Sequence, residues 1–411
     1  MSGTLAERSE RDTQPDFPMA RGRCPYDPPP QVTQLRAERP VGRVTLYDGS
    51  RPWLFTRHTD VRALLADRRF SSDIRKPGFP LTSPARRGRA AQQNPSFISL
   101  DDPDHARLRK MLISEFTVRH TASLRPMVVE TVAELLDAMA AAPQPADLVE
   151  QFALPLPSMV ICRLLGVPYT DHGYFQELSA KMLTMSLPPQ DALRVSDELR
   201  GYLRELIGRR IAEPDDGMLG RVIAPRVRAG DLSLEDGASM AQLLLVAGHE
   251  TTANQLALGT MVLLDNPDQA AELRDTDDQA VVDGAVEELL RLLTIVHNAR
   301  ARIATEDVEI GGVLVEAGEG VLASTEAANR DPDAFPDPDR LDIHRAERHH
   351  MAFGFGVHQC LGQPLARLEL RVAYPALLRR FPNLAIARPA AELDFRGDRF
   401  VYGVHHLPVT W

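Results

Sequence analysis

The stretch FGFGVHQCLG, residues 353–362, decides how the whole sequence is interpreted, because a rare cysteine stands among several glycines. The chain has 3 cysteines in 411 residues, so neither a disulfide framework nor a thiol-rich metal site is expected. Glycines on both sides of Cys360 let the backbone approach a ligand closely and adopt turns that other residues avoid. Judged alone, such a cysteine is more often an inert buried thiol, so Cys360 needs support from the rest of the chain.

The residues after Cys360 predict a helix that begins close to the sulfur. Apolar side chains recur at helical spacing from Leu361 to Val372, and Pro364 is compatible with a first helical turn. A thiolate at a helix N-terminus is stabilised by unpaired backbone N–H groups and by the helix dipole. Cys360 is therefore a candidate thiolate ligand.

The overall composition argues against several classes of partner. The net charge of -10 and the pI near 5.7 disfavour nucleic acid or an anionic membrane as the main partner. An odd number of widely spaced cysteines suits a reducing cytoplasm, and the first residues carry no apolar signal region. No stretch reaches the roughly 18 apolar residues of a membrane span. These features predict a soluble cytoplasmic protein.

Helical periodicity dominates the chain, so a mainly α fold with a minor β-rich part is expected. Residues 1–35 are polar and rich in Pro and Arg, and we expect them to form an N-terminal surface arm. No repeat or low-complexity linker divides the remainder, so residues 36–411 are expected to form a single domain.

Three segments depart from this helical pattern. Hairpins are predicted at residues 43–57 and 308–324, each with a turn that contains glycine. The segment 71–99 is broken by repeated Pro and Gly and is interpreted as structureless. Such a segment is typical of a lid or binding loop, or of a disordered insertion.

A long helix is expected in the middle of the chain. Ser233 caps it, with Asp236 three residues on, and apolar periodicity continues to Leu264. A helix of roughly 31 residues is about 47 Å long, enough to cross the molecule. Its middle, LLLVAGHETTANQLALG at residues 243–259, carries an unexpected polar run. That run marks either a functional site or a polar patch on one helix edge.

The polar run does not form a zinc protease motif. His249 and Glu250 could begin the HExxH pattern of these enzymes. That pattern needs a second histidine at position 253, where this chain has Ala253. The zinc protease interpretation therefore fails.

Taken together, three motifs resemble those of the cytochrome P450 family, the haem-thiolate monooxygenases. The motifs are Phe353-x-x-Gly356-x-x-x-Cys360-x-Gly362, the helix stretch AGHETT at residues 247–252 and Glu288-x-x-Arg291. They follow the family's order over nearly the full chain. The resemblance implies the cytochrome P450 fold, a large helical domain with a minor β-rich part around a buried haem.

Finer details indicate the type of relative. Stretches such as DIHRAERHHMAFGFGVHQCLGQPLARLEL resemble soluble actinomycete-type members. Those commonly oxidise secondary metabolites such as polyketides or macrolides, sterol-like compounds or xenobiotics. The implied reaction inserts one atom of dioxygen into such a molecule, usually as a hydroxylation.

The resemblance implies haem b, iron-protoporphyrin IX, as the cofactor and Cys360 as the axial ligand of its iron. A thiolate ligand pushes electron density onto the iron and favours O–O cleavage. The two haem propionates need cationic partners. Matching family positions assigns the other cofactor contacts to His105, Arg109, Ala247, Gly248, Arg302, Phe353, Gly354, His358 and Gly362. Judged by composition, a solvated basic face is as good an interpretation of Arg109.

Proton delivery is assigned to the central helix. Activation of dioxygen requires an acid and a hydroxyl relay beside the iron. The resemblance implies Glu250 and Thr251 as this pair, with Ala247 and Gly248 leaving room for oxygen. Thr252 is either a helper or a hydroxyl that is satisfied within its own helix.

A second group of polar residues is assigned a structural role. Glu288 and Arg291 are three residues apart on a helix, where such pairs contribute about 0.2–0.5 kcal/mol. The resemblance instead implies a buried network behind the haem, completed by Arg340. Leu341 stands where many relatives carry Phe, so Arg345 competes with Arg340 for this place.

Substrate contacts are placed by the resemblance, although the substrate itself stays unnamed. They fall in the loop 75–97, in the segment 182–187 and at several single positions. Met, Leu and Phe in these regions suit an apolar small molecule, and Arg75 or Asn298 could hold an oxygen function. A core-packing role is an equal alternative for each. The substrate-facing residues implied are Arg75, Leu244, Ala247, Val296, Asn298, Phe400 and Val401.

Electrons are expected to come from NAD(P)H through a separate ferredoxin and its reductase. The family core uses the full length, and the cysteines are too few for an iron–sulfur cluster. An acidic partner is expected to dock on the cysteine side of a monomer. The basic patch predicted there consists of Arg107, Lys110, Arg348 and Arg367.

Two other functions are weighed against this one. A haem-binding sensor or carrier needs the same cysteine but no proton relay. A zinc hydrolase would need short ligand spacings that recur as pairs, and the histidines near Cys360 do not form such a pattern. Those histidines are His344, His349, His350 and His358.

Overall fold

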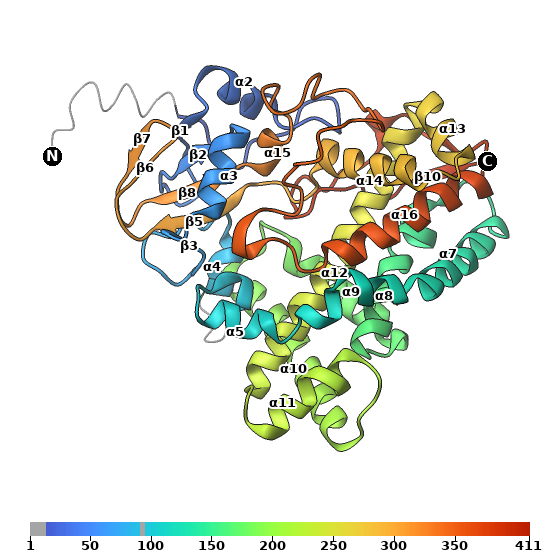
Figure 1. The fold of residues 1–411 in the computed structure, drawn as a ribbon, viewed down its shortest axis with the longest axis horizontal. Coiled ribbons are helices and arrows are strands. Elements are labelled where there is room, and N and C mark those ends of the chain that lie inside the picture. The colour runs from blue at the N-terminus through green and yellow to red at the C-terminus, as the bar shows by residue number, and fades with distance from the viewer. Residues whose placement is uncertain (1–13, 91–94) are drawn as a thin grey trace.

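The structure is a computed structural model that describes residues 14–90 and 95–411. It is mainly helical, and its strands are short. Figure 1 shows the largest sheet on one side of the molecule and the long helices on the other. The predicted fold class is therefore confirmed.

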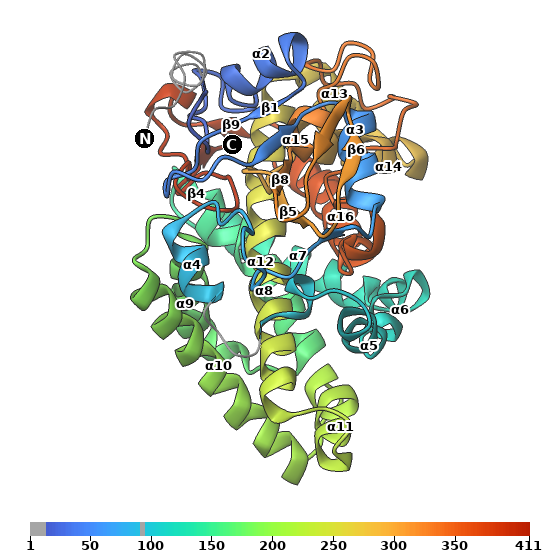
Figure 2. The same ribbon diagram turned by 90° about the vertical axis from the view of Figure 1, so that its left-hand side faces the viewer.

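The helix α12 (Leu234–Leu264) passes through the middle of the molecule, as Figure 2 shows. Its predicted start is confirmed, because the Ser233 side chain accepts a hydrogen bond from the Asp236 N–H at 3.0 Å. Most of its residues are buried. Within the polar run in its middle, His249, Glu250 and Thr252 are buried, whereas Thr251 is partly exposed.

Other helices pack around α12 and make the main hydrophobic core. Those in direct contact with it include α8, α10, α14 and α16. The longer helices are α7 (Arg125–Ala140), α8 (Pro155–Leu165), α9 (His172–Leu183), α10 (Pro189–Ala212), α13 (Pro267–Asp275), α14 (Gln279–Leu293) and α16 (Gln363–Arg380). The shorter ones are α2 (Pro30–Glu38), α3 (His58–Ala66), α4 (Pro84–Ala90), α5 (Asp104–Lys110), α6 (Val118–Ser123), α11 (Ala224–Ala229) and α15 (Thr325–Ala328).

The largest sheet has five strands in the order β1-β2-β8-β5-β3. Strands β1 and β2 form the first predicted hairpin, and β8 joins β2 in parallel. Strand β5 lies between β8 and β3 and runs antiparallel to both. The strands are β1 (Val41–Arg43), β2 (Trp53–Phe55), β3 (Phe70–Ser71), β5 (Arg300–Ala304) and β8 (Gly320–Ala323).

Two smaller sheets complete the β structure. Strands β6 (Val308–Ile310) and β7 (Val313–Val315) confirm the second predicted hairpin, whose turn holds two glycines with positive φ. Strand β10 (Pro408–Thr410) pairs with β4 (Ala146–Asp147) and β9 (Ala385–Ile386). This pairing ties the end of the described chain to the middle of the sequence.

The interpretation of residues 71–99 as structureless is wrong, because α4 forms within them. Residues 91–94 of this segment lie outside the described part. Gly88 lets α4 approach α10 closely, since a Cβ there would lie 2.1 Å from the Pro189 carbonyl oxygen. The reason for the error is tertiary contact, which stabilises a short helix that local composition disfavours.

The first residues that the structure describes are packed onto the sheet. Residues 1–13 of the expected surface arm lie outside the described part. Within residues 14–35, Phe17, Met19 and Val32 are buried in a small core beside the sheet. This part of the arm is therefore anchored by apolar burial rather than lying free on the surface.

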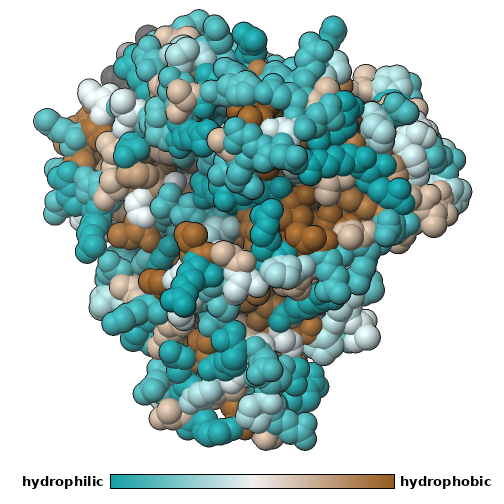
Figure 3. All heavy atoms as spheres, turned by 45° about the vertical axis from the view of Figure 1, so that its right-hand side comes forward, coloured by the Kyte–Doolittle hydropathy of each residue, from teal (hydrophilic) through white to brown (hydrophobic). Residues whose placement is uncertain are grey.

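The surface is mostly hydrophilic on the face in Figure 3, with a hollowed apolar area. An apolar groove on this side lies between α7 and α16 and is lined by residues that include Val132, Leu136 and Val372. Among the described residues, no helix combines the length and hydropathy that crossing a bilayer requires.

Candidate active site

The cysteine loop is folded back on itself by short backbone contacts. The Cys360 N–H donates to the Phe353 carbonyl at 2.9 Å. Gly354 and Gly356 have φ of 71° and 75°, so the glycine requirement is confirmed at these two positions. Gly362 differs, because its φ of -78° suits any residue. It directly precedes α16, and a Cβ there would lie 4.0 Å from the Cys360 sulfur.

The Cys360 side chain is free and accessible, although protein surrounds the loop that carries it. Burial of the sulfur's surroundings raises the pKa of the Cys360 thiol. The backbone N–H groups of Gly362 and Gln363 donate to the sulfur and lower this pKa. The positive charges of Arg300 and Arg109 lower it as well. The site therefore contains the groups that stabilise a thiolate.

Two histidines lie against each other beside this loop. The ring centroids of His105 and His358 are 4.1 Å apart. His105 Nε2 and His358 Nδ1 are buried without a hydrogen-bond partner among the described residues. Burial, with the nearby charges of Arg302, His105 and Arg109, lowers the pKa of His358 to about 3. Burial also lowers the pKa of His105, although Asp102 opposes this.

Two arginines, Arg109 and Arg302, lie with these histidines beside the cysteine loop. Arg109 donates from Nη2 to the Gln359 carbonyl at 2.7 Å, next to Cys360. Arg302, on β5, donates only to the carbonyl of Ala301 at 2.8 Å. Burial and the charge of Arg300 lower the pKa of Arg302 to about 10. The structure thus brings the predicted cofactor contacts on α5, β5 and the cysteine loop together.

The two histidine nitrogens lack partners among the described residues, and neither arginine has a carboxylate partner there, so the group fits a ligand with carboxylates near Cys360. Buried polar groups in native proteins are normally paired, so unpaired ones point to a ligand. Arginine and histidine side chains are suitable partners for carboxylates. The residues present therefore fit a haem, with its thiolate ligand and two propionates.

The middle of α12 presents an accessible surface within an otherwise buried helix. Ala247 is exposed and Gly248 and Thr251 are partly so, while Glu250 is buried. The Thr251 hydroxyl donates to the Ala247 carbonyl at 2.8 Å. Glu250 pairs with Arg396, with 3.3 Å between Nη1 and Oε2. The predicted acid and alcohol are thus adjacent, and the acid has a charged partner.

Backbone hydrogen bonds join the predicted substrate segments. The Phe400 N–H donates to the Leu183 carbonyl at 2.9 Å, and the Tyr402 N–H to the Ile295 carbonyl at 2.8 Å. The segment 182–187 and the residues around 296 and 400 are therefore side by side. Three parts of the chain far apart in sequence meet here.

The single residues predicted to face the substrate fall into two groups. The first group is buried or partly buried, as is expected of a substrate-pocket wall or of core packing. Its buried members are Leu244, Asn298 and Val401, and its partly buried members are Val296 and Phe400. Thr252, the possible helper in proton delivery, is also buried. Arg75 is exposed on the surface and paired with Asp73 at 2.8 Å. A substrate contact of Arg75 stays a prediction.

Comparison with known proteins decides the family. Residues 27–388 match the family described as Cytochrome P450. The chain belongs to the cytochrome P450 family. It is 52% identical to Cytochrome P450-SU2 of Streptomyces griseolus over 409 residues, which cover 99% of this chain and 100% of the relative. It is 51% identical over 399 residues, 97% of each chain, to the Vitamin D3 dihydroxylase of the same species.

A solved structure of the family agrees in fold. The crystal structure of GfsF is 48% identical and has a TM-score of 0.90, covering 97% of this chain and 100% of that one. GfsF comes from Streptomyces halstedii. This P450 is therefore a monooxygenase, an oxidoreductase whose family uses haem on a cysteine thiolate.

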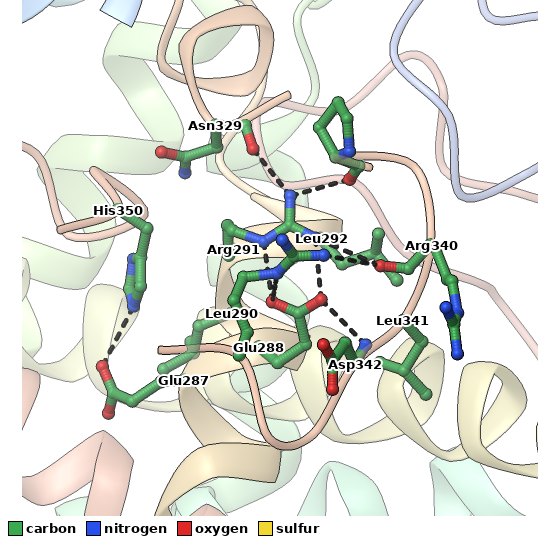
Figure 4. Close-up of polar contacts among 12 residues, drawn as sticks. Glu287, Glu288, Leu290, Arg291, Leu292, Asn329, Arg340, Leu341, Asp342 and His350 are labelled. Carbon is green, nitrogen blue, oxygen red and sulfur yellow. Dashed lines mark hydrogen bonds and ion pairs between the residues drawn. The ribbon is translucent and has the colours of Figure 1, made fainter. Parts of the chain in front are cut away.

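In this P450, Glu288 and Arg291 form a buried ion pair on α14, which Figure 4 shows. Arg291 Nε and Nη2 lie 2.7 and 2.8 Å from the two oxygens of Glu288. Arg345 Nε donates to Glu288 Oε2 at 3.0 Å. All three side chains are buried. The predicted network is therefore present, with Arg345 as its third charge.

The choice of Arg340 for this network is corrected to Arg345. The Arg340 side chain is exposed and extends away from Glu288 in Figure 4. Only its carbonyl takes part, accepting from Arg345 Nη2 at 3.2 Å. The Arg340 N–H donates to the Asp337 carbonyl at 3.1 Å and closes a turn. This turn leaves the Arg340 side chain on the side that faces away from Glu288. Sequence spacing does not reveal which side of such a turn faces inward.

Sequence reasoning missed several charged residues of the site. Arg396, the partner of Glu250, comes from a loop without a motif, so no local signal identifies it. Arg300 could have been found, because it stands two residues before Arg302 in a strand. Side chains at i and i+2 of a strand share one face.

The histidines near Cys360 have separate partners. His344 pairs with Glu272 at 2.8 Å and His350 with Glu287 at 3.0 Å, while His349 stacks on Phe335. In the described part of the chain, no three His, Cys, Asp or Glu residues gather as metal ligands. A site with one cysteine ligand is what the geometry supports.

We expect Arg345→Ala to destabilise the protein strongly and Arg340→Ala to have little effect. Loss of Arg345 leaves buried charge and carbonyls without a partner, at a cost on the order of 3 kcal/mol. Arg340→Ala removes only an exposed side chain and should change stability by less than about 0.5 kcal/mol. Urea unfolding of both variants measures the difference. Equal stabilities would show that Arg345 is not a member of the network.

Proposed function

We propose that this P450 binds haem b through Cys360 and inserts one atom of dioxygen into a small molecule with an apolar body. The observation that carries the proposal is the accessible Cys360 sulfur at the start of α16, beside two buried histidine nitrogens that have no partner among the described residues. When bound, a haem with a thiolate ligand supplies the activation of dioxygen. The rest of the chemistry belongs to residues of this chain.

Four side chains would hold the two propionates. His105 Nε2 and His358 Nδ1 are free to donate, and Arg109 and Arg302 bring guanidinium groups to the same place. Charge-assisted hydrogen bonds of this kind are stronger than neutral ones. Phe353, Gly354, Gly362, Ala247 and Gly248 would line the cofactor.

Glu250 and Thr251 would deliver protons. The Thr251 hydroxyl sits on the accessible part of α12 and can hold a proton at Oγ1. Glu250 is buried one residue earlier, and its ion pair with Arg396 keeps its carboxylate in place. Held there, Glu250 would pass protons to the neighbouring Thr251 hydroxyl. The role of Thr252 in this relay stays a prediction.

Hydroxylation of a secondary metabolite, a sterol-like compound or a xenobiotic is the reaction that we propose. The similarity to a relative called Vitamin D3 dihydroxylase supports it. Leu244, Val296, Phe400 and Val401 would offer apolar contact, and Asn298 a polar one. Pockets of this kind are mostly apolar with a few polar groups that fix orientation.

A ferredoxin fed by an NAD(P)H-dependent reductase would supply the electrons. Arg107, Lys110 and Arg348 are exposed and can form the docking patch. Arg367 is less available, because it binds Glu287 at 2.6 Å. Burial alone would raise the pKa of Glu287. The hydrogen bonds from His350 and Arg367 outweigh this effect and lower the pKa to about 2. The patch should therefore depend on the first three residues.

The first prediction for this function is that Cys360→Ser abolishes the thiolate-type carbon monoxide difference spectrum. The side chain lies in a loop before α16, so most of the helix content should remain. Cys24→Ser is the matched control, since Cys24 is an exposed free cysteine in another part of the chain, and it should keep the spectrum. A thiolate-type spectrum that persists in Cys360→Ser would overturn the ligand assignment.

We expect Thr251→Ala to uncouple oxygen consumption from product formation. The variant loses one small hydroxyl and should still bind haem, but proton delivery becomes disordered and hydrogen peroxide leaves instead. Product formed per NAD(P)H oxidised should fall by about tenfold or more. Thr251→Ser keeps the hydroxyl and should retain coupling. If Thr251→Ala stays coupled, another group carries the proton.

Docking of the electron donor should depend on charge. Joint neutralisation of Arg107, Lys110 and Arg348 should weaken reduction by ferredoxin, and added salt should weaken it in the unmodified protein. A control triple consists of the exposed residues Lys181, Arg194 and Arg209 on α9 and α10, on the opposite side in Figure 2. The measurement is the reduction rate against ferredoxin concentration. Equal rates for the two triples would contradict this docking surface.

A further inference from the structure

Four partly buried arginines from two distant segments lie close enough to influence one another electrostatically. Arg86 and Arg89 lie on α4, and Arg300 and Arg302 lie on β5. Arg86 is within electrostatic reach of the other three guanidinium groups. Arg300 is in turn within reach of Cys360. The cluster therefore extends from the cysteine loop to α4.

This cluster lacks a matching negative charge. Arg87, the neighbour of Arg86 on α4, is exposed and pairs with Asp48 at 2.7 Å. Among the described residues, no carboxylate lies within ion-pair distance of Arg86, Arg89 or Arg300. Burial and the surrounding arginines lower the pKa of Arg86 to about 9. Partly buried cations without a counter-ion are unfavourable, so an anion is expected to accompany them.

The other contacts of these side chains are weak or neutral. The Arg86 guanidinium lies 5.6 Å from the centroid of the Phe400 ring, and Arg89 donates to the Met182 carbonyl. Arg300 stands two residues before Arg302, so both side chains leave β5 on the same face. None of these contacts neutralises a charge.

The walls around Arg86 are the segments expected to face the substrate. The Ala85 N–H of α4 donates to the Met185 carbonyl at 3.4 Å. Asn298 contacts the same residue, with its amide nitrogen 3.2 Å from the Met185 sulfur. Phe400 lies under the Arg86 guanidinium. Arg86 therefore lies beside the segments that carry the predicted substrate residues.

The haem does not account for all of these cations. It brings two propionates, and His105, Arg109, Arg302 and His358 already surround the place assigned to them. Arg86 is left over, Arg300 has no anion near it except the Cys360 sulfur, and Arg89 is held by a carbonyl. The surplus positive charge lies on the α4 side of the chamber.

We propose that the substrate carries a carboxylate, which Arg86 and Arg300 bind while its apolar body extends toward α12. Guanidinium groups bind carboxylates in a bidentate manner, which fixes orientation as well as affinity. The substrate class is then an amphiphilic acid rather than a purely apolar molecule. This inference rests on the proposed function, because it uses the same chamber.

The test uses probes that need no knowledge of the substrate. Imidazoles with an alkyl chain of increasing length are prepared in matched pairs, ending in a carboxylate or in an alcohol. The imidazole binds the haem iron and shifts the Soret band, which gives a dissociation constant. At the best chain length, the carboxylate should bind at least about tenfold more tightly than the alcohol, as expected of a charge-assisted contact.

Arg86→Gln and Arg300→Gln should each remove most of this preference, and Arg86→Gln should leave alcohol binding nearly unchanged. Because Arg300 also lies within electrostatic reach of Cys360, the haem content and the carbon monoxide difference spectrum of Arg300→Gln are measured beside its binding. Arg87→Gln is the matched control, because Arg87 is an exposed neighbour on α4 that is paired with Asp48. It should keep the full preference. Arg300→Lys, which retains the charge, should keep part of it.

Three results would overturn the inference. The first is equal binding of acid and alcohol at every chain length by the unmodified protein. The second is a preference that survives in both glutamine variants. The third is partial loss of haem from those variants, with the preference intact in the fraction that keeps its haem, which would assign the two arginines to the cofactor. If no probe shifts the Soret band, it is the proposed function that fails.

Discussion

The position of one sulfur atom, at the start of α16, constrains the rest of this structure. To bring Cys360 there, the chain must turn through Gly354 and Gly356 at positive φ. A Cβ on Gly356 would lie 2.3 Å from the Leu65 carbonyl oxygen, so the loop is packed tightly against α3. The cysteine loop thus joins the β-rich part to the helical part, and the proposed haem site lies where they meet.

Helix α12 supplies the opposite constraint. Gly248 has no room for a side chain, because a Cβ there would lie 2.7 Å from Ile161. The helix is therefore pressed against α8 at the level where Ala247 is accessible. A charged Glu250 is tolerated in this buried wall because Arg396 is paired with it. Close packing on one side of the helix and an open side on the other define where chemistry can occur.

The features that the sequence predicted well are those with local causes. The Ser233 cap and the turns of both hairpins depend on residues next to one another, so their positions were read correctly. The motif residues followed from a family resemblance that covers nearly the full chain. The features that the sequence predicted wrongly depend on which way the chain turns and packs in the folded protein. Arg345 rather than Arg340 faces Glu288 because of one turn, and α4 forms because it can pack on α10.

The charge distribution of the interior bears on how this enzyme selects its substrate. The chain is acidic overall, with a net charge of -10, yet the chamber wall gathers arginines that no carboxylate among the described residues neutralises. Apolar contacts alone discriminate weakly, by about 10–200-fold per methylene group. A buried polar site that is left unpaired by the wrong ligand discriminates by about 10⁴-fold or more. Selection by Arg86 and Arg300 would thus act on charge first, and the apolar wall around Phe400 would then decide which carbon lies nearest the reaction centre.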